Sequence, residues 1–439
     1  MLKQDGFDVD FYDGIAKRES YEDFEREFER FKPDAVAFET KTPVVKQHWQ
    51  IINKIKEQHP ETAFVLMGDH VTALPKESFL RSKVDYVVTG GDMDISLFGL
   101  MKHIRDGSGM PKGIWFRKGR TVKNNGRFAL EKNLDRLPFV DRKLTHWELY
   151  GEAYLLRPVA YTMAGRDCPM RCSFCSWSWN LFPGMRYRSV ENYLNEVEML
   201  VNEYKVKEIF DDTGTLTVNK KWVEDFCKGM IERGLSEKVA ISANARFDNL
   251  ADAEFCQLMQ RAGFRLLKVG LESGNDKTLK MICKGETVET MEHGYKNAKD
   301  AGLIMMLTIM VGYPWESRKE AEKTIEVAAK LLQYKTKVGD SLQASVVVSY
   351  PGTLLYEQAR KNKWFRVKDG QWERFDMTEP VMKTSMKPEE VMEMCKSVWS
   401  IHTDPIYALK TLASVKSWQE FMLLLRGVRS VVGHIKDYA

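Results

Sequence analysis

Three cysteines on one short loop constrain this chain most. They stand in Cys168-Pro169-Met170-Arg171-Cys172-Ser173-Phe174-Cys175, directly after the apolar run Val159–Gly165. Spacings of four and three residues allow the three thiols to converge on one metal centre. No fourth cysteine lies near enough in the sequence to complete that centre. The pattern therefore predicts a metal centre that keeps one coordination position open.

Thiolates bind zinc or iron–sulfur clusters, so a zinc knuckle is the alternative. Structural zinc is normally closed by four ligands, and this loop offers neither a second cysteine pair nor a nearby histidine. We therefore favour an iron–sulfur cluster. The other cysteines stand singly in helix-like segments, where buried structural thiols are expected: Cys227, Cys256, Cys283 and Cys395.

The motif CxxxCxxC, with Phe174 before the third cysteine, resembles the signature loop of radical S-adenosylmethionine enzymes. The resemblance implies that Cys168, Cys172 and Cys175 hold a [4Fe–4S] cluster whose open iron is chelated by S-adenosylmethionine. In that family an electron from the cluster cleaves the sulfonium to a 5′-deoxyadenosyl radical, or a methyl group passes to a second cofactor. A reductant such as ferredoxin or flavodoxin is then expected.

Length and composition set wider bounds. A chain of 439 residues, 44% of them apolar, predicts two to three packed domains. The 66 basic and 62 acidic residues nearly balance, so no nucleic-acid partner is expected. No segment is apolar enough to span a bilayer and the start shows no secretory signal, which predicts a cytoplasmic protein with reduced thiols.

The second half of the chain alternates strand and helix six times, which predicts a partial, TIM-like (βα)6 barrel with parallel strands. The strands are expected to begin near Val159, Lys207, Lys238, Phe264, Leu303 and Ser341. The helices are expected at Val190–Tyr204, Lys221–Arg233, Ala251–Ala262, Val288–Ala301, Lys319–Gln333 and Leu354–Asn362. Catalytic groups of such barrels lie at the carboxyl ends of the strands, where polar or glycine-rich residues follow each strand here.

The resemblance assigns several of these residues to S-adenosylmethionine. Asp211, Asp212 and Thr213 stand where the family contacts the amino group, and Arg246 matches a basic residue near the carboxylate. The structural alternative for Asp212 is to cap the helix that follows Asn219. The residues implied for the ribose and the adenine are Glu272, Ser273, Phe174 and Gly312.

Two of these last assignments have structural alternatives. Glu272 has lysines within reach in the sequence, so it could instead pair with Lys268 or Lys284. Gly312 could keep the backbone close to the adenine because it lacks a Cβ, or it could serve an ordinary turn.

The first hundred residues alternate short apolar runs with amphipathic helices, the pattern of a doubly wound α/β domain. Strands are expected at Phe7–Tyr12, Ala35–Glu39, Ala63–Met67 and Tyr86–Thr89, and helices at Tyr21–Arg30, Val45–Gln58, Glu77–Ser82 and Leu97–Arg105. This half resembles the flavodoxin-like or Rossmann-like cobalamin-binding domain that precedes the radical domain in one large subgroup. The resemblance lies in the segments 7–13, 68–75 and 85–92.

The first domain departs from the family pattern in three ways. Asp69 replaces a glycine, and Gly91 and Asp92 replace a Glu-Gly pair on loops expected to face the corrin. The chain also begins inside what would be the first helix, so the domain is expected to lack its first strand. His70 and Thr72 are the candidate cobalamin contacts, and a loop histidine bonded to backbone is the alternative for His70.

A hairpin and a linker are expected between the domains, with strands Gly113–Arg117 and Arg127–Leu130 and a turn at Asn124-Asn125-Gly126. We therefore predict a cobalamin-binding-type domain at 1–110, a hairpin and linker at 111–157, and a radical barrel at 158–365. A helical extension at 366–439 is expected to contain helices Pro388–His402 and Pro405–Arg426. Its basic, amphipathic end predicts peripheral membrane contact.

The favoured function is a radical S-adenosylmethionine enzyme, with cobalamin-dependent methyl transfer to an unactivated carbon of a small or lipid-like substrate. A cobalamin-independent radical cyclase or rearrangement enzyme is the first alternative. A methylthiotransferase-like enzyme is the second, although residues 1–167 lack the three further cysteines that such enzymes use. A non-catalytic iron–sulfur binding protein is the third.

Overall fold

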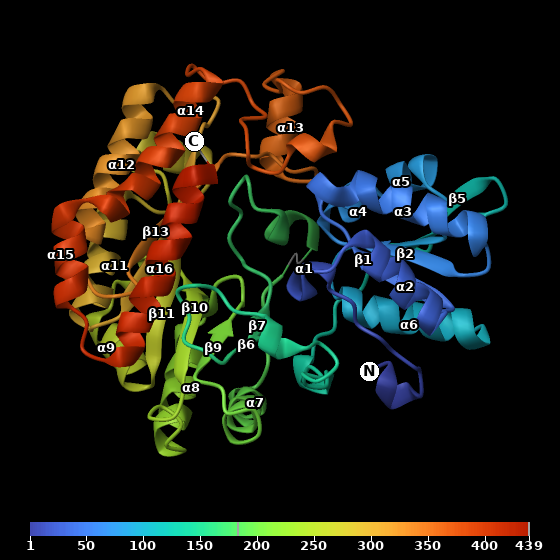
Figure 1. Ribbon diagram of the computed structural model, residues 1–439, viewed down its shortest axis with the longest axis horizontal. Coiled ribbons are helices and arrows are strands. Elements are labelled where there is room, and N and C mark those ends of the chain that lie inside the picture. The colour runs from blue at the N-terminus through green and yellow to red at the C-terminus, as the bar shows by residue number, and fades with distance from the viewer. Residues whose placement is uncertain (182–183, 438–439) are drawn as a thin grey trace.

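The computed structural model describes residues 1–181 and 184–437, with the backbone alone at 434–437. Two sheets organise the chain (Figure 1). The smaller sheet belongs to the N-terminal part, and the larger one belongs to the middle of the chain. The C-terminal helices lie along the larger sheet, away from the N-terminal part.

The larger sheet is parallel throughout, in the order β13-β12-β11-β10-β9-β6. Because β6 and β13 are its two edges, the sheet is an open, partial barrel. Each predicted strand start lies within two residues of the observed one. The strands are β6 (Val159–Thr162), β9 (Glu208–Asp211), β10 (Ala240–Ala245), β11 (Phe264–Glu272), β12 (Ile304–Val311) and β13 (Ser341–Val346).

Amphipathic helices cover the outer face of this sheet. In α8, Trp222, Val223 and Phe226 recur at helical spacing and join the core that also holds Ile241 of β10. The crossover helices are α7 (Val190–Asn202), α8 (Lys220–Glu232), α9 (Ala253–Arg261), α10 (Asp276–Met281), α11 (Val288–Asp300), α12 (Arg318–Leu332) and α13 (Leu354–Lys361).

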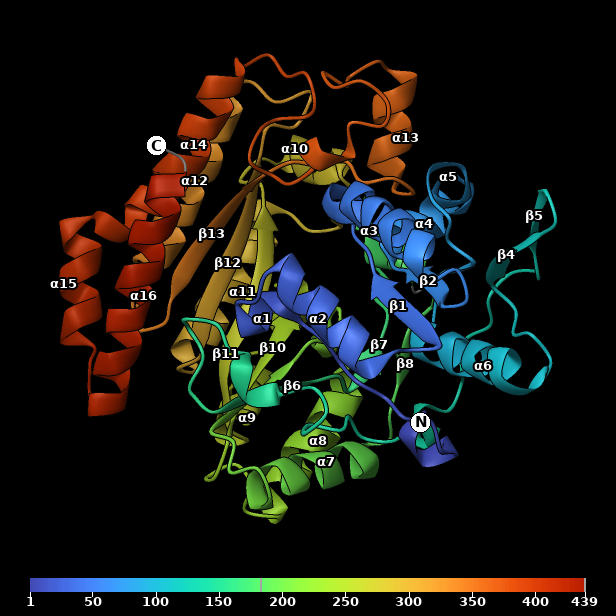
Figure 2. The same cartoon turned by 45° about the vertical axis from the view of Figure 1, so that its right-hand side comes forward.

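The C-terminal helices pack at the β13 edge, as Figure 2 shows. They are α14 (Pro388–Ser400), α15 (Pro405–Ala413) and α16 (Trp418–Asp437). The single helix predicted at Pro405–Arg426 is wrong. It breaks because the Ser414 hydroxyl donates to Thr411 O and accepts from Val338 N, while Ser417 Oγ accepts the Glu420 amide at the start of α16.

The smaller sheet runs β1-β2-β3-β4-β5, with three parallel strands followed by an antiparallel hairpin. Helices cover both faces, since Phe28 and Trp49 pack on one side while Leu100 packs on the other. The strands are β1 (Ala35–Glu39), β2 (Ala63–Met67), β3 (Tyr86–Val88), β4 (Ile114–Lys118) and β5 (Thr121–Asn124). The helices are α1 (Gly14–Lys17), α2 (Tyr21–Phe31), α3 (Val45–Gln58), α4 (Asp69–Ala73), α5 (Pro75–Arg81) and α6 (Met93–Asp106).

The strand predicted at Phe7–Tyr12 is wrong. β1 is the edge of the sheet, so the neighbour that this segment would need for hydrogen bonding is absent from the described residues. The segment instead lies against helices: Phe7 stacks under Arg105 of α6 at 4.3 Å, and the Tyr12 ring lies 5.4 Å from Phe24 of α2. An alternating apolar pattern is not sufficient for a strand without a paired edge.

The hairpin is present, but its predicted turn is wrong. The chain reverses at Gly119-Arg120, with Lys118 opposite Thr121 and with Gly119 at φ 62°. A two-residue turn of this kind needs a positive φ, which glycine adopts without strain. The predicted turn residues 124–126 instead return the chain toward β4, where Asn125 N donates to Ile114 O.

A carboxylate joins the two parts of the chain. Asp92, which is 1% exposed, follows β3 and pairs with Arg166 and Arg186 of the second part at 2.7 Å each. Burial alone would raise the pKa of Asp92, but the two guanidinium groups lower it below its ordinary value. Asp94 adds a more exposed contact to Arg166 at 2.7 Å. The two parts are therefore held by a buried ionic contact.

We expect Asp92→Asn to lower the free energy of unfolding by about 3 kcal/mol, because it leaves two largely buried guanidinium groups without their shared partner. Asp94→Asn is the control and should cost less than about 1 kcal/mol, since its carboxylate is exposed. Urea unfolding of both variants measures the difference. Equal effects of the two substitutions would contradict the assignment.

Candidate active site

The parallel strands place the loops that follow them at one edge of the sheet. The loop after β6 carries the three cysteines and ends in a π-helical turn, η5 (Trp177–Leu181). Its backbone is fixed from two sides: Ser173 N donates to Ile282 O and Ser173 O accepts from Leu355 N, each at 2.8 Å. The Trp179 indole donates to Cys172 O at 2.9 Å. The cysteine loop is thus held by distant segments of the chain.

The three thiols lie within electrostatic range of one another. Burial raises the pKa of Cys172 to about 12, and the neighbouring Cys175 adds to the effect. Burial also raises the pKa of Cys175, to which Cys168 contributes. Cys168 is partly exposed, and its sulfur lies 3.3 Å from Thr215 Oγ1. Such thiols deprotonate readily only when a metal takes the place of the proton.

This donor set fits a cluster better than a single ion. Among the described side chains of residues 1–181 and 184–433, no three His, Cys, Asp or Glu side chains lie close enough to bind one metal ion. A mononuclear zinc site needs four ligands at about 2.0–2.3 Å from one centre. In a cluster each thiolate binds a different iron, so the sulfurs stand farther apart. The loop therefore fits a [4Fe–4S] cluster.

The residues after β9 have two roles: some stabilise the loop, and one can contact a ligand. Asp211 is fully buried and accepts from Ala164 N at 2.8 Å and from Thr213 N at 2.9 Å. Thr213 is buried too, and its hydroxyl accepts from Gly165 N. Only Asp212 of the three reaches solvent, and it accepts from Asn244 Nδ2 at 3.2 Å. Asp211 and Thr213 therefore fix the loop, whereas Asp212 is free to meet a ligand.

The proposed structural role of Asp212 as a helix cap is wrong. Asn219 caps α8 instead, because its side-chain oxygen accepts the Trp222 amide at 3.1 Å. An asparagine at this position satisfies a helix amide that would otherwise have no partner.

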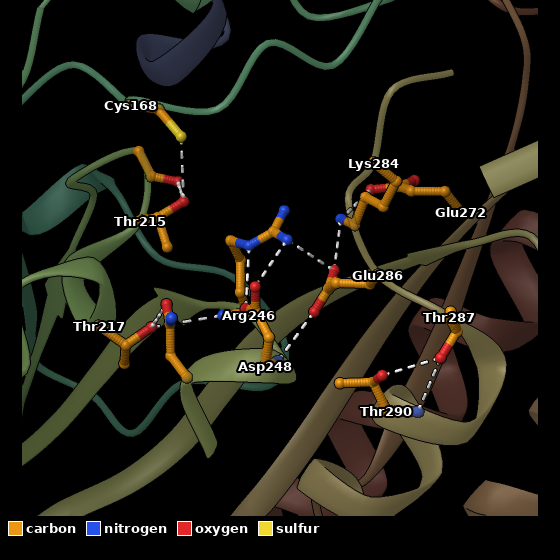
Figure 3. A network of polar contacts seen from close by, with 12 residues as sticks. Cys168, Thr215, Thr217, Arg246, Asp248, Glu272, Lys284, Glu286, Thr287 and Thr290 are labelled. Carbon is orange, nitrogen blue, oxygen red and sulfur yellow. Dashed lines mark hydrogen bonds and ion pairs between the residues drawn. The ribbon is translucent and has the colours of Figure 1, made fainter. Parts of the chain in front are cut away.

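Figure 3 shows a network of buried charges after β10 and β11. Arg246 binds Asp248 through two nitrogens at 3.0 and 3.1 Å and lies 3.5 Å from Glu286. Lys284 lies between two carboxylates, 3.5 Å from Glu272 and 3.7 Å from Glu286. The expected alternative partner of Glu272, Lys284, is therefore present. Burial raises the pKa of Glu272, and Lys284 opposes that rise.

Sequence reasoning missed Asp248 and Glu286, and it named Lys284 only as a possible partner of Glu272. The signal was present, since Cys283-Lys284-Gly285-Glu286 places two opposite charges in the loop after α10. What the sequence did not show is that Ile282 pairs with the cysteine loop and carries these charges to the site.

The remaining predicted S-adenosylmethionine contacts, Ser273, Gly312 and Phe174, lie in different surroundings. The Ser273 hydroxyl is buried and lies 3.2 Å from Thr324 Oγ1, so it stabilises the turn after β11. Gly312 has φ 98°, and a Cβ there would lie 2.9 Å from Val391 of α14. Phe174 is partly buried against the core.

The two predicted cobalamin contacts lie within the protein, although His70 Nε2 has no hydrogen-bond partner among the described residues and lies 3.6 Å from Glu77 Oε2. The His70 side chain is buried, with Nδ1 3.2 Å from Thr42 Oγ1 and its ring 5.1 Å from that of Trp372. The Thr72 hydroxyl donates to Gly68 O at 2.7 Å and accepts from Gly90 N at 2.8 Å. Both residues fix loops at the ends of β2 and β3, and the His70 side chain is fully enclosed by the protein.

The position of these loops does fit a cofactor shared between the two parts. α4 lies against η5, directly after the cysteine loop. Gly91 N also donates to Leu181 O, and Phe128 packs on Gly90.

Comparisons with known proteins agree with this architecture. Residues 163–328 match the model of the Radical SAM superfamily, and residues 1–95 match the B12 binding domain. The chain belongs to the radical SAM superfamily and carries a B12-binding domain. The predicted fold class, the enzyme class and the expected cofactors, a [4Fe–4S] cluster, S-adenosylmethionine and cobalamin, are thereby confirmed at the level of the family.

The matches to related proteins cover nearly the whole of this chain. An uncharacterized methyltransferase, PH0819 of Pyrococcus horikoshii, is 27% identical over 410 residues, covering 92% of this chain and 86% of its own. The anaerobic magnesium-protoporphyrin IX monomethyl ester cyclase of Cereibacter sphaeroides is 25% identical, covering 87% of this chain and 62% of its own.

A solved structure shows the same fold. The radical S-adenosylmethionine methyltransferase TsrM of Kitasatospora setae, with cobalamin and a [4Fe–4S] cluster bound, matches with a TM-score of 0.71. The match covers 100% of this chain and 95% of that chain at 15% identity. At this identity the likeness concerns the fold alone.

We expect Cys172→Ala to abolish the cluster in anaerobically reconstituted protein, because only two thiolates of the loop remain. Cys283→Ala is the matched control, since Cys283 is exposed and lies outside the loop. Bound iron and sulfide per chain and the visible absorption spectrum are the measurements. Retention of about four irons per chain by Cys172→Ala would contradict the site.

Proposed function

We propose that this chain is a cobalamin-dependent radical SAM methyltransferase that acts on a carbon atom. The observation that carries the proposal is the position of the cysteine loop. It lies at the carboxyl edge of the larger sheet, with the B12-binding domain packed against its end through α4 and η5. Two cofactors, one from each part, would meet at this edge.

In the proposal, Cys168, Cys172 and Cys175 hold the cluster, and an electron donor such as ferredoxin or flavodoxin reduces it. Asp212 accepts a hydrogen bond from the amino group of S-adenosylmethionine, and Arg246 faces its carboxylate. The family contacts at Glu272, Ser273, Thr213, Phe174 and Gly312 remain predictions for the ribose, the adenine and the shape of the loops. Lys284 keeps Glu272 in place, so that its backbone and carboxylate are oriented toward the ribose.

Cobalamin, when bound, supplies a carrier that passes a methyl group to a carbon-centred radical. The residues of this chain bind and orient the cofactors and exclude water. Because the His70 side chain is fully buried and the Thr72 hydroxyl is hydrogen-bonded within the protein, we propose that they shape the corrin-facing loops without binding cobalt. Asp69, the first residue of α4, lies near enough to Tyr350 of the second part of the chain to add to the rise in the Tyr350 pKa that burial causes.

The relatives favour methyl transfer over the alternatives. PH0819 is named a methyltransferase, and TsrM is a methyltransferase that matches over almost its whole length. A cyclase is the main alternative, because the second relative is a cyclase. Methylthiolation is disfavoured because residues 1–167 contain no cysteine for a further cluster.

The test is anaerobic reconstitution with iron, sulfide and hydroxocobalamin, followed by incubation with S-adenosylmethionine and a reductant. We expect bound corrin, S-adenosylhomocysteine that forms only when cobalamin is present, and 5′-deoxyadenosine that is lost in Cys172→Ala. Iron without corrin would indicate the cyclase or rearrangement alternative. Zinc as the bound metal would disprove the assignment as a radical SAM enzyme.

We also propose that the C-terminal helices touch a membrane surface. Along the described residues no helix is both long and apolar enough to cross a bilayer. Large apolar side chains are nevertheless exposed along α15 and α16, with Lys410, Arg426 and Arg429 on the same helices. The exposed apolar residues are Ile406, Leu409, Leu412, Trp418, Met422, Leu425, Val428 and Val432. Cytoplasmic location stays a prediction.

Cosedimentation with vesicles of anionic phospholipid tests this contact. Replacing Leu409 and Trp418, which are 66% and 74% exposed, by serine should reduce the bound fraction severalfold. The control is Leu80→Ser, an equally exposed leucine of α5. Binding that is absent in the original chain, or that falls equally in the control, would contradict the proposal.

A further inference from the structure

The two faces of the larger sheet differ in chemistry. Alternate residues such as Ala243, Val269 and Leu307 are fully buried and belong to the core beneath the helices. Their neighbours along each strand point to the inner face, because successive side chains of a strand alternate between faces. The partly exposed positions of the inner face include the polar residues Asn244, Lys268, Thr308, Gln343 and Ser345, together with Gly270 and Met310.

Strand register brings these side chains into one band. Asn244 lies opposite Lys268, and Thr308 lies opposite Gln343. Ser345 lies two residues beyond Gln343 on the same face. Laterally paired residues on one face have Cβ atoms about 5 Å apart, so their side chains can contact one ligand. On β12, Met306 lies opposite Lys268 and Met310 lies opposite Ser345. The inner face therefore combines polar groups from four neighbouring strands with two methionines.

The band lies next to the charge network of the candidate active site. Gly270 occupies the inner face between Lys268 and Glu272, and it is opposite Thr308. A Cβ on Gly270 would lie 2.0 Å from Glu272 Oε1 and 2.8 Å from Lys284 Nζ. The Glu272–Lys284 pair therefore lies directly over this glycine, one step above the band.

The opposite end of the inner face is filled. Arg265 pairs with the buried Glu208 at 2.8 Å, and Glu208 also binds Ser242 and the Leu156 amide. Leu155 and Phe210 pack as a buried apolar cluster at the same level. A ligand on the band is thus bounded below by protein and faces the cysteine loop above.

The band has unused hydrogen-bonding capacity. Within the part of the chain that the structure describes, Lys268 makes no hydrogen bond or ion pair. The side chains of Thr308, Gln343 and Ser345 likewise have no protein partner among the described residues. Lys268 acts on Asp212 and Glu272 only at longer range, lowering the pKa of each carboxyl against the larger effect of burial. An ammonium with a hydroxyl, an amide and a second hydroxyl is suited to an oxygen-rich anion.

We propose that Lys268, Thr308, Gln343 and Ser345 bind a carboxylate or phosphate group of the substrate. The substrate is then a polar acid whose charged end lies on the inner face of the sheet, while its reacting carbon extends toward the cysteine loop. A purely hydrocarbon, lipid-like substrate would leave this ammonium and three polar groups unpaired, which costs free energy. The claim that the bound anion belongs to a substrate rests on the proposed function. The claim that an anion binds here does not.

Equilibrium dialysis of the reconstituted holoenzyme, saturated with S-adenosylmethionine, tests the site with two probes, labelled inorganic phosphate and labelled acetate. We expect one anion per chain, with affinity about tenfold weaker in Lys268→Met, because a charged hydrogen bond is lost. Gln343→Leu should weaken binding less. Stronger binding of phosphate would identify a phosphorylated substrate, and stronger binding of acetate would identify a carboxylic acid.

The control is Lys337→Met, which removes a partly buried lysine that donates to Gly302 O away from the inner face. Equal anion binding by Lys268→Met and the original chain would overturn the proposal, as would the absence of binding of both probes. Weaker binding of S-adenosylmethionine in Lys268→Met, with anion binding unchanged, would instead assign Lys268 to the cofactor and also overturn it.

The same samples separate this inference from the proposed function. Bound iron, bound corrin and 5′-deoxyadenosine formation are measured without any substrate. If these fail in the original chain while anion binding still depends on Lys268, the methyltransferase proposal falls and the anion site stands. If they succeed and Lys268→Met binds anions normally, only the anion site falls.

Discussion

The candidate active site depends on the parallel pairing of the six strands β6, β9, β10, β11, β12 and β13. Parallel strands end at the same edge, so residues far apart in the sequence meet there. The cysteine loop after β6 and the charges after β10 and β11 would otherwise have no reason to be neighbours. The backbone contact between Ser173 and Ile282 shows how close this convergence is.

Buried charge is the second constraint on this edge. Arg246, Glu272, Lys284 and Glu286 are all largely buried, and each lies near an opposite charge. Unpaired, each would carry a large desolvation cost. Pairing allows the protein to hold fixed charges beside the cysteine loop, where cofactor binding requires both signs. The polar side chains of the inner face just below have fewer partners, and Lys268 makes no hydrogen bond or ion pair among the described residues.

The sequence predicted the elements that depend on local pattern. The six barrel strands were placed well because strand and helix periods alternate clearly, and the cysteine loop was recognised from its spacing. The strand at Phe7–Tyr12 was wrong because pairing requires a neighbour that pattern alone does not reveal. The hairpin turn was wrong because two glycine-containing turns competed, and Gly119 is the one that the strand register selects. Glu286 was missed because its role arises from a tertiary contact, whereas Lys284 was named as a possible partner of Glu272 because it is close in the sequence.

The attachment of the cysteine loop has a consequence for how the protein matures. Ser173 is bonded on both its amide and its carbonyl to backbone from elsewhere in the chain, and the Trp179 indole bonds the Cys172 carbonyl. None of these bonds involves a sulfur atom. Protein contacts that need no iron can therefore hold the backbone of the loop, unlike small zinc domains in which the metal drives folding. Iron delivery can then follow the formation of these contacts.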